Sequence, residues 1–149
     1  MIAVIQRVSS SSVTVEGKVV GKIGKGLNIL LGVKKGDKQE DISKLVSKIA
    51  NLRIFSDSDG KMNLSLLDVK GEALIISQFT LAGNVKKGRR PSFDSSEKPD
   101  IAKAMYEQFV KEFESLGIHT QIGEFGAHMD VDIHNDGPVT FILDSSELN

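Results

Sequence analysis

Strand-like apolar segments gather at both ends of this chain, and two segments with helical periodicity lie between them. The strand-like runs are rich in β-branched residues or alternate in polarity, and they cover residues 2–8, 11–16, 19–23, 27–33, 53–55, 73–76, 118–124, 128–134 and 139–143. Many of the connections between them have the length of hairpin turns. This order predicts an α+β fold, with a mostly antiparallel sheet or open β-barrel covered by two helices.

The two helical segments are amphipathic. Their apolar faces consist of Ile42, Leu45, Val46 and Ile49 in the first, and of Ile101, Ala102, Met105, Phe109 and Phe113 in the second. This spacing predicts helices over about residues 38–51 and 99–116. Asp37 followed by Glu40 is a variant of the capping box, so we expect Asp37 to be the N-cap of the first helix.

The chain has 149 residues, of which 40% are hydrophobic and 26% charged, and this predicts a single globular domain over residues 1–149. It contains no cysteine, which excludes disulfides, thiolate metal sites and a cysteine nucleophile. No apolar run approaches the roughly 20 residues of a membrane span, and the N-terminus resembles a strand and not a signal peptide. We therefore expect a cytoplasmic protein without membrane contact.

A small polar cluster follows the apolar run 73–76 and consists of Ser77, Gln78, Phe79 and Thr80. Backbone N–H groups at a rigid strand end, beside hydroxyls and an amide, can stabilise the oxyanion that forms when an ester is attacked. Thr80 is a candidate nucleophile, but a hydroxyl needs an adjacent base and the sequence places no His or Lys beside it. The alternative is a strand end whose hydroxyls bond the local backbone, and the pattern alone favours it.

A second cluster, Asn135-Asp136-Gly137-Pro138, precedes the run 139–143. Its ordinary interpretation is a turn, with Pro138 where the following strand needs no ladder N–H. An X–Pro bond is cis in only about 5–6% of cases, so these residues alone favour a trans bond. The functional alternative is a rigid backbone wedge whose carbonyl groups face a ligand.

A metal site is the strongest rival interpretation, and it rests on residues 128–134. In a strand, His128, Asp130, Asp132 and His134 share one face. These residue types bind divalent metals, but the two histidines would lie roughly 20 Å apart, too far to share one ion. The run therefore indicates a solvated strand face, and we expect no metal or other cofactor.

A basic loop carries Lys86, Lys87, Arg89 and Arg90 within five residues. Because the formal net charge is −1, any nucleic-acid contact must come from such a local patch. Charge runs are usually just solvated loops. The closeness of this one to the 77–80 cluster nevertheless makes a phosphate-binding role reasonable.

The 77–81 and 135–140 motifs resemble those of the D-aminoacyl-tRNA deacylases, the D-tyrosyl-tRNA(Tyr) deacylase family. The resemblance also covers residues 1–8, 87–93, 123–129 and 143–145, and so runs the full length of the chain. It implies a homodimeric hydrolase that cleaves the ester joining a D-amino acid to the 3′-terminal adenosine of tRNA, without a cofactor.

The resemblance also implies roles for individual residues. Ser77, Gln78, Phe79 and Thr80 would build the catalytic site. Gly137-Pro138 would be a Gly-cis-Pro pair that reaches into the partner subunit's site and excludes L-amino acids by steric clash. The attack would be driven either by Thr80 or by the neighbouring ribose 2′-OH of the substrate.

Three classes of function remain open from the residues. The first, which the resemblance favours, is a metal-free esterase acting on D-aminoacyl-tRNA. The second is a metallohydrolase that uses residues 128–134 and loses activity in EDTA. The third is a non-catalytic RNA-binding module that binds tRNA through the basic loop and turns nothing over.

Overall fold

Strand β1 (Ile2–Val15) organises the fold, because three other strands pair with it. The computed structural model describes residues 1–149. Strands β2 (Lys18–Ile23) and β3 (Gly26–Gly32) pair with successive parts of one edge of β1, and β8 (Asp130–Asp144) pairs along the other. All three pairings are antiparallel. Local hairpins and a long return strand therefore build the centre of the sheet.

The sheet continues with parallel neighbours. Strand β6 (Glu72–Ser77) pairs with β3, and β7 (Thr120–Ile122) pairs with β6, which gives a mixed sheet of order β2-β1-β3-β6-β7. The two ends of this order approach each other, because a Cβ at Gly21 of β2 would lie 2.4 Å from the Ile122 carbonyl oxygen of β7. The sheet is thus nearly closed. A separate small sheet joins β4 (Phe55–Ser56) to β5 (Met62–Leu64).

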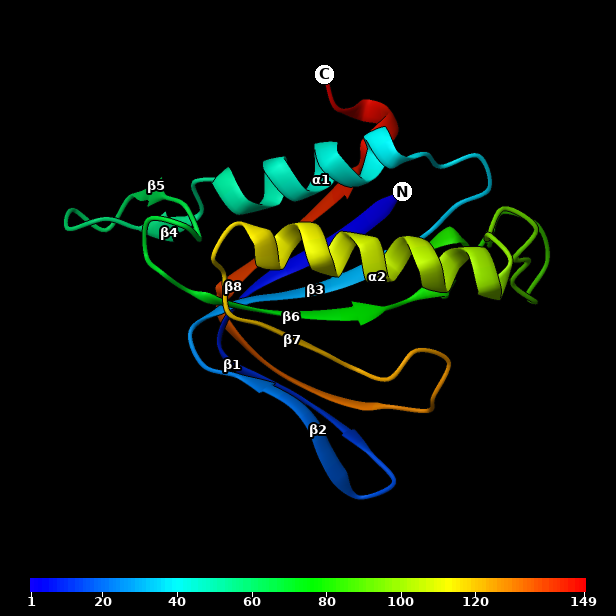
Figure 1. Ribbon diagram of the computed structural model, residues 1–149, viewed down its shortest axis with the longest axis horizontal. Helices are drawn as coiled ribbons and strands as arrows, with labels where there is room; N and C mark the ends of the chain where they lie inside the picture. The colour runs from blue at the N-terminus through cyan, green and yellow to red at the C-terminus, as the bar shows by residue number, and fades with distance from the viewer.

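Helices α1 (Gln39–Asn51) and α2 (Pro99–Ser115) lie on one face of the sheet (Figure 1). Their apolar faces form the larger core with residues of β1, β3 and β6 such as Ile5, Ile29 and Ile75. Alternate residues of the same strands, including Leu74 and Ile76, point the other way into a smaller core inside the barrel. The predicted α+β fold, with two helices over a barrel-like sheet, is confirmed.

Several predicted boundaries were wrong in detail. The runs 2–8 and 11–16 form one strand, and the runs 128–134 and 139–143 form another, because bulges in the β1–β8 ladder let both strands continue. Strand β4 begins two residues later than the predicted 53–55 strand, and β7 is shorter than 118–124. The chain leaves β6 at Ser77, and Phe79 begins a short 3-10 helix, η1 (Phe79–Ala82), so β6 ends one residue later than the predicted 73–76 run.

The predicted cap of α1 was also wrong. Lys38 is the N-cap, and its N–H donates to the Asp41 carboxylate at 2.7 Å. Asp37 has other partners, because its carboxylate accepts from the buried Met1 ammonium at 2.5 Å and from the Lys34 N–H at 2.6 Å. A charge from the start of the chain therefore overrides the local capping pattern. A second short 3-10 helix, η2 (Ser145–Glu147), follows β8 beside this site.

Candidate active site

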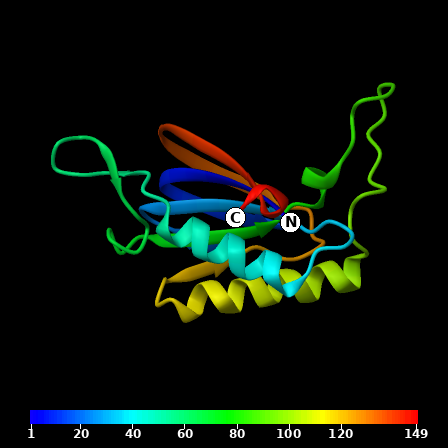
Figure 2. The ribbon, with the colours of Figure 1, turned by 90° about the horizontal axis from the view of Figure 1, so that it is seen from above.

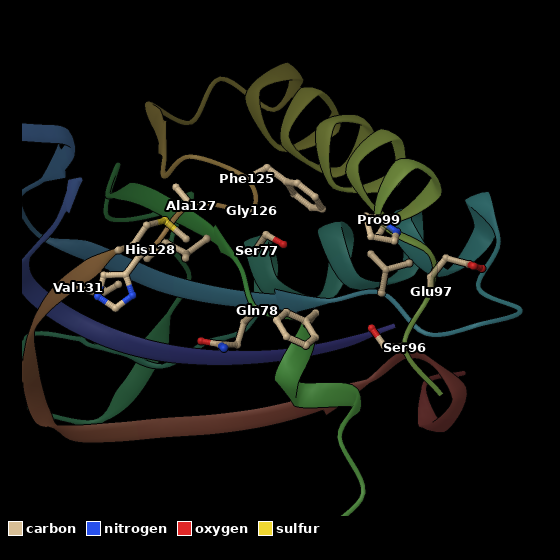
Figure 3. A pocket seen from close by; sticks show the side chains of 15 residues that line it. Ser77, Gln78, Ser96, Glu97, Pro99, Phe125, Gly126, Ala127, His128 and Val131 are labelled. Atoms are coloured by element: carbon tan, nitrogen blue, oxygen red, sulfur yellow. The ribbon is translucent and has the colours of Figure 1, made fainter. Parts of the chain in front are cut away.

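A cavity of about 430 Å³ opens where β6 ends. Ile76, Ser77, Gln78 and Phe79 form the side that comes from this strand end. Phe125, Gly126, Ala127, His128, Met129 and Val131 come from the segment between β7 and β8 and the start of β8. Ser96, Glu97, Pro99 and Ala102 come from the approach to α2 and its first turn. Figure 3 shows Ser77 between the Phe125–His128 segment and the Ser96–Pro99 segment.

The strand end is held firmly from behind. The Gln78 N–H donates to the Leu31 carbonyl at 2.8 Å, which extends the β3–β6 ladder past Ser77. The buried Tyr106 hydroxyl of α2 donates to the Ile75 carbonyl at 2.7 Å, and its ring lies 5.9 Å from that of Phe125. Burial raises the pKa of the Tyr106 phenol, so this hydroxyl stays protonated as a donor. The β6 side and the Phe125 side of the cavity are therefore both in contact with Tyr106 of α2.

The predicted catalytic residues do not all face the cavity. Ser77, Gln78 and Phe79 line it, whereas Thr80 is exposed beside it. The Thr80 hydroxyl accepts a hydrogen bond from the Gln78 side-chain amide at 2.5 Å and has no other side-chain partner. No base contacts it, so the structure brings the cluster together without activating Thr80 as a nucleophile.

Gly137 and Pro138 lie on a bulge of β8. Gln6 pairs with Thr140 and Val8 with Asn135, so the four residues 136–139 of β8 face the single residue Arg7 of β1. The peptide bond between Gly137 and Pro138 is cis. Both residues are exposed, and neither lines the cavity of its own chain.

Arg7 holds the base of this bulge. The residue is 9% exposed, and its guanidinium donates to the Asp136 carbonyl at 3.0 Å and to the Ile54 carbonyl at 2.8 Å. Gly137 leaves space for it, since a Cβ there would lie 3.3 Å from the Arg7 guanidinium and 2.6 Å from Val139. The Asn135 side chain accepts from the Val139 N–H at 2.8 Å and closes the other end of the bulge.

The basic loop projects from the body as an arm formed by residues 83–97 (Figure 2). Asn84 and Ser92 exchange two backbone hydrogen bonds of 2.7 and 2.9 Å at its neck. Lys86, Lys87, Arg89 and Arg90 lie beyond this neck, are exposed, and make no ion pair with an acidic side chain. Their charges are therefore free for an anionic partner.

A family model described as D-Tyr-tRNA(Tyr) deacylase matches residues 4–144, a range that contains both motifs, the arm and the cavity. The chain belongs to the D-Tyr-tRNA(Tyr) deacylase family. Two relatives named D-aminoacyl-tRNA deacylase, from Persephonella marina and Aquifex aeolicus, are 66% and 60% identical to it; each alignment covers 99% of this chain and 100% of the relative. The resemblance drawn from the sequence is confirmed.

Solved structures share the fold of this chain. The structure titled "c-Myc DNA Unwinding Element Binding Protein" superimposes with a TM-score of 0.91 at 40% identity, covering 97% of this chain and 98% of that one. A probable eukaryotic D-amino acid tRNA deacylase gives a TM-score of 0.82 at 18% identity, with coverages of 95% and 97%, and shows a shared fold.

Sequence reasoning had assigned the cavity only one of its three sides. Ser96, Glu97, Pro99 and residues 125–127 carried no predicted functional role, and His128 was considered only as a metal ligand. Residues 123–129 contributed to the family resemblance all the same. A signal was present in Gly126, whose φ of 78° marks the tight turn that presents Ala127 and His128 to the cavity. Arg7, a lone charge in an apolar run, was a second signal that went unused.

The strand face considered for a metal is solvated. His128, Asp130, Asp132 and His134 are exposed, while Met129, Val131 and Ile133 pack against the smaller core. No three His, Asp or Glu side chains lie close enough together to hold a metal ion. None of the helices combines the length and the apolar character that a membrane crossing requires.

Proposed function

We propose that the chain hydrolyses the ester bond of D-aminoacyl-tRNA to a free D-amino acid and tRNA, as a chiral proofreading step in translation. The observation that carries this proposal is the cavity at the Ser77–Phe79 strand end, in a chain whose family is named for this deacylation. A cavity of about 430 Å³ has the size of a small-molecule site. It can admit the aminoacylated end of a tRNA, while the tRNA body must lie outside.

The proposed chemistry uses the substrate's own ribose. Thr80 has no neighbouring base, whereas the 2′-OH of the terminal adenosine adjoins the ester wherever the substrate binds. In our proposal this hydroxyl assists a water whose oxygen attacks the carbonyl carbon. The bond to the ribose 3′-oxygen then breaks, and that oxygen takes the proton. Backbone groups and the Gln78 amide position the ester and stabilise the oxyanion, without a metal.

The proposed basis of chirality is the Gly137–Pro138 bulge of a second protomer. The bulge is exposed and lies outside its own cavity, so it is available to enter another one. Strand β8 pairs only with β1, and its open edge exposes 40% of Phe141 and 72% of Ile142. An open apolar edge of this kind is normally covered. A homodimer with a site shared across subunits would cover it and bring the wedge against the α-carbon of the substrate.

Exclusion by a wedge makes glycine a substrate. If the wedge occupies the space that an L side chain needs, a hydrogen at that position meets no clash, and glycyl-tRNA enters. A site that selected D substrates by gripping their side chains would spare glycine instead. Glycyl-tRNA therefore distinguishes steric exclusion of L side chains from binding of D side chains as the cause of the D preference.

One experiment tests these proposals together. D-tyrosyl-, L-tyrosyl- and glycyl-tRNA are incubated with the protein, with and without EDTA, while ester loss is followed. We expect the D-tyrosyl and glycyl esters to be cleaved at rates unaffected by EDTA, and the L-tyrosyl ester to persist. Equal cleavage of the D and L esters contradicts the proposed D specificity, and loss of activity in EDTA contradicts the proposed metal-free chemistry. Resistance of the glycyl ester alone contradicts only the wedge.

The arm is the proposed site that binds the tRNA backbone, because its four cations are exposed and unpaired. Changing Lys86, Lys87, Arg89 and Arg90 to glutamine should weaken binding and reduce the slope of log affinity against log salt by about one for each phosphate that is no longer neutralised. The matched control changes four exposed lysines on the helices, Lys44, Lys48, Lys103 and Lys111. An unchanged slope in the arm variant places the tRNA elsewhere.

A further inference from the structure

We propose that Phe93, at the root of the arm, is a positioning residue that holds Phe79 at the cavity and joins the arm to it. Phe79 lines the cavity but is 55% exposed, so packing against a core does not fix its ring. The Phe93 ring meets it edge to face, with centroids 5.1 Å apart and an interplanar angle of 61°. Such a pair restrains both rings by a geometric preference beyond their buried area.

Phe93 itself is fixed against the backbone that follows Phe79. Two of its ring carbons lie 3.0 and 3.4 Å from the position that a Cβ at Gly83 would take. The Gly83 N–H donates to the Thr80 carbonyl at 2.9 Å and ends η1. Only a glycine leaves room for the ring here, since a Cβ would also lie 2.9 Å from the Thr80 carbonyl oxygen. The ring therefore packs on the same short segment whose side chain it orients.

The neck of the arm connects this pair to the rest of the cavity. The Asn84–Ser92 backbone pair closes the neck one residue before Phe93. After it, the Lys35 N–H donates to the Ser95 carbonyl at 2.9 Å, and the Glu97 N–H donates to the Val33 carbonyl at 3.1 Å. Val33 and Glu97 both line the cavity. A tRNA held by the arm cations would thus fix the neck, and through Phe93 it would fix one side of the cavity.

This inference rests on the proposed function and predicts a defect in turnover, not in tRNA binding. Phe93→Leu removes the edge-to-face pair. In Gly83→Ala both aromatic residues remain, but the new Cβ collides with the Phe93 ring and with the Thr80 carbonyl oxygen, so the pair is displaced. Each change should lower kcat on D-tyrosyl-tRNA about twofold to tenfold, which is the range of an aromatic pair. KM, tRNA affinity and its salt slope should stay as in the wild type. Phe93→Tyr keeps the ring and should restore kcat.

Val19→Ala is the control, because Val19 lies on β2 away from the arm, is 61% exposed and does not line the cavity. Wild-type kcat in both Phe93→Leu and Gly83→Ala, or a loss confined to tRNA affinity, overturns the proposal. A loss of kcat that Val19→Ala shares also overturns it. Ring-flip rates of Phe79, measured by NMR without substrate, separate this inference from the function: they should rise in Phe93→Leu even if the wild type cleaves no ester, and unchanged rates refute the restraint.

Discussion

The cavity and the Gly137–Pro138 bulge are built in opposite ways. The cavity is enclosed on three sides by segments that are distant in the sequence. Hydrogen bonds from Gln78 to β3 and from Tyr106 of α2 to Ile75 fix its β6 side. The bulge is an exposed projection of four residues opposite one, and a single buried arginine holds its base. All three sides of the cavity come from one chain, whereas the bulge does not reach the cavity of its own chain. Changes in the first should therefore alter rate, and changes in the second should alter selectivity.

The largest expected effect comes from a bulky side chain that fills the cavity. Ala127 lines the cavity, so Ala127→Trp should occupy space that the aminoacyl end needs. We expect kcat/KM on D-tyrosyl-tRNA to fall about a hundredfold or more, since small misplacements of a reacting group already cost that much. Ala104→Trp, on the exposed face of α2 and outside this cavity, is the control and should keep wild-type activity. A fully active Ala127→Trp variant would move the reaction out of the cavity.

The next effect separates selectivity from rate. Pro138→Ala removes two ring carbons from the wedge, and even one methylene in a tight site is worth about tenfold or more in discrimination. We expect the ratio of D- to L-tyrosyl-tRNA hydrolysis to fall by about that factor, while the D rate changes less than about threefold. Pro91→Ala on the arm is the control. If the ratio stays constant while the D rate collapses, the bulge belongs to the catalytic machinery and the contrast with the cavity fails.

Arg7 tests what holds the bulge. Arg7→Met keeps much of the length of the side chain but leaves the Asp136 and Ile54 carbonyls without their donor. We expect a decrease of about 2–3 kcal/mol in the free energy of unfolding, measured with urea, because buried acceptors stay unpaired. The D to L ratio should fall as well. Arg7→Lys should recover only part of both, since a lysine cannot reproduce the two-armed geometry of a guanidinium. A stable variant with unchanged selectivity would mean that the bulge holds its own shape.

Features with a local cause were predictable from the sequence. The spacing of Ile42, Leu45, Val46 and Ile49 identified α1. The 77–81 and 135–140 motifs singled out Ser77–Phe79, which line the cavity, and Gly137–Pro138, which lie on the bulge. Features that depend on long-range pairing were not. Because β7 pairs with β6 in parallel, the 125–129 segment that follows β7 lies beside Ser77 at the cavity. No local sequence pattern predicts that pairing. Asp37 failed as a cap for the same reason, because the Met1 ammonium that binds it comes from the start of the chain.

The smallest expected effect concerns the ion pair that connects the two regions. Lys34 follows Val33 at the cavity, and Asp144 ends β8, the strand that carries the bulge; their charged atoms lie 2.6 Å apart. Burial by itself would raise the pKa of Asp144, but hydrogen bonds from Lys34 and Ser146 outweigh it and lower this pKa to about 2. Both side chains are partly exposed, so we expect a contribution to stability of about 1 kcal/mol.

The sign of the pH dependence follows from the lowered pKa. The folded value lies below the ordinary 3.8, so the contribution is fully present above about pH 4 and disappears as the pH falls toward 2. Asp144→Asn should therefore be less stable than the wild type by about 1 kcal/mol at pH 7, and the difference should vanish near pH 2. The exposed Asp130→Asn serves as control and should show no such step. If the cavity and the Gly137–Pro138 bulge act independently, Asp144→Asn leaves unchanged both the rate of D-tyrosyl-tRNA hydrolysis and its ratio to the L-tyrosyl-tRNA rate. A shift in the ratio without a change in rate would show instead that this ion pair sets where the bulge stands relative to the cavity.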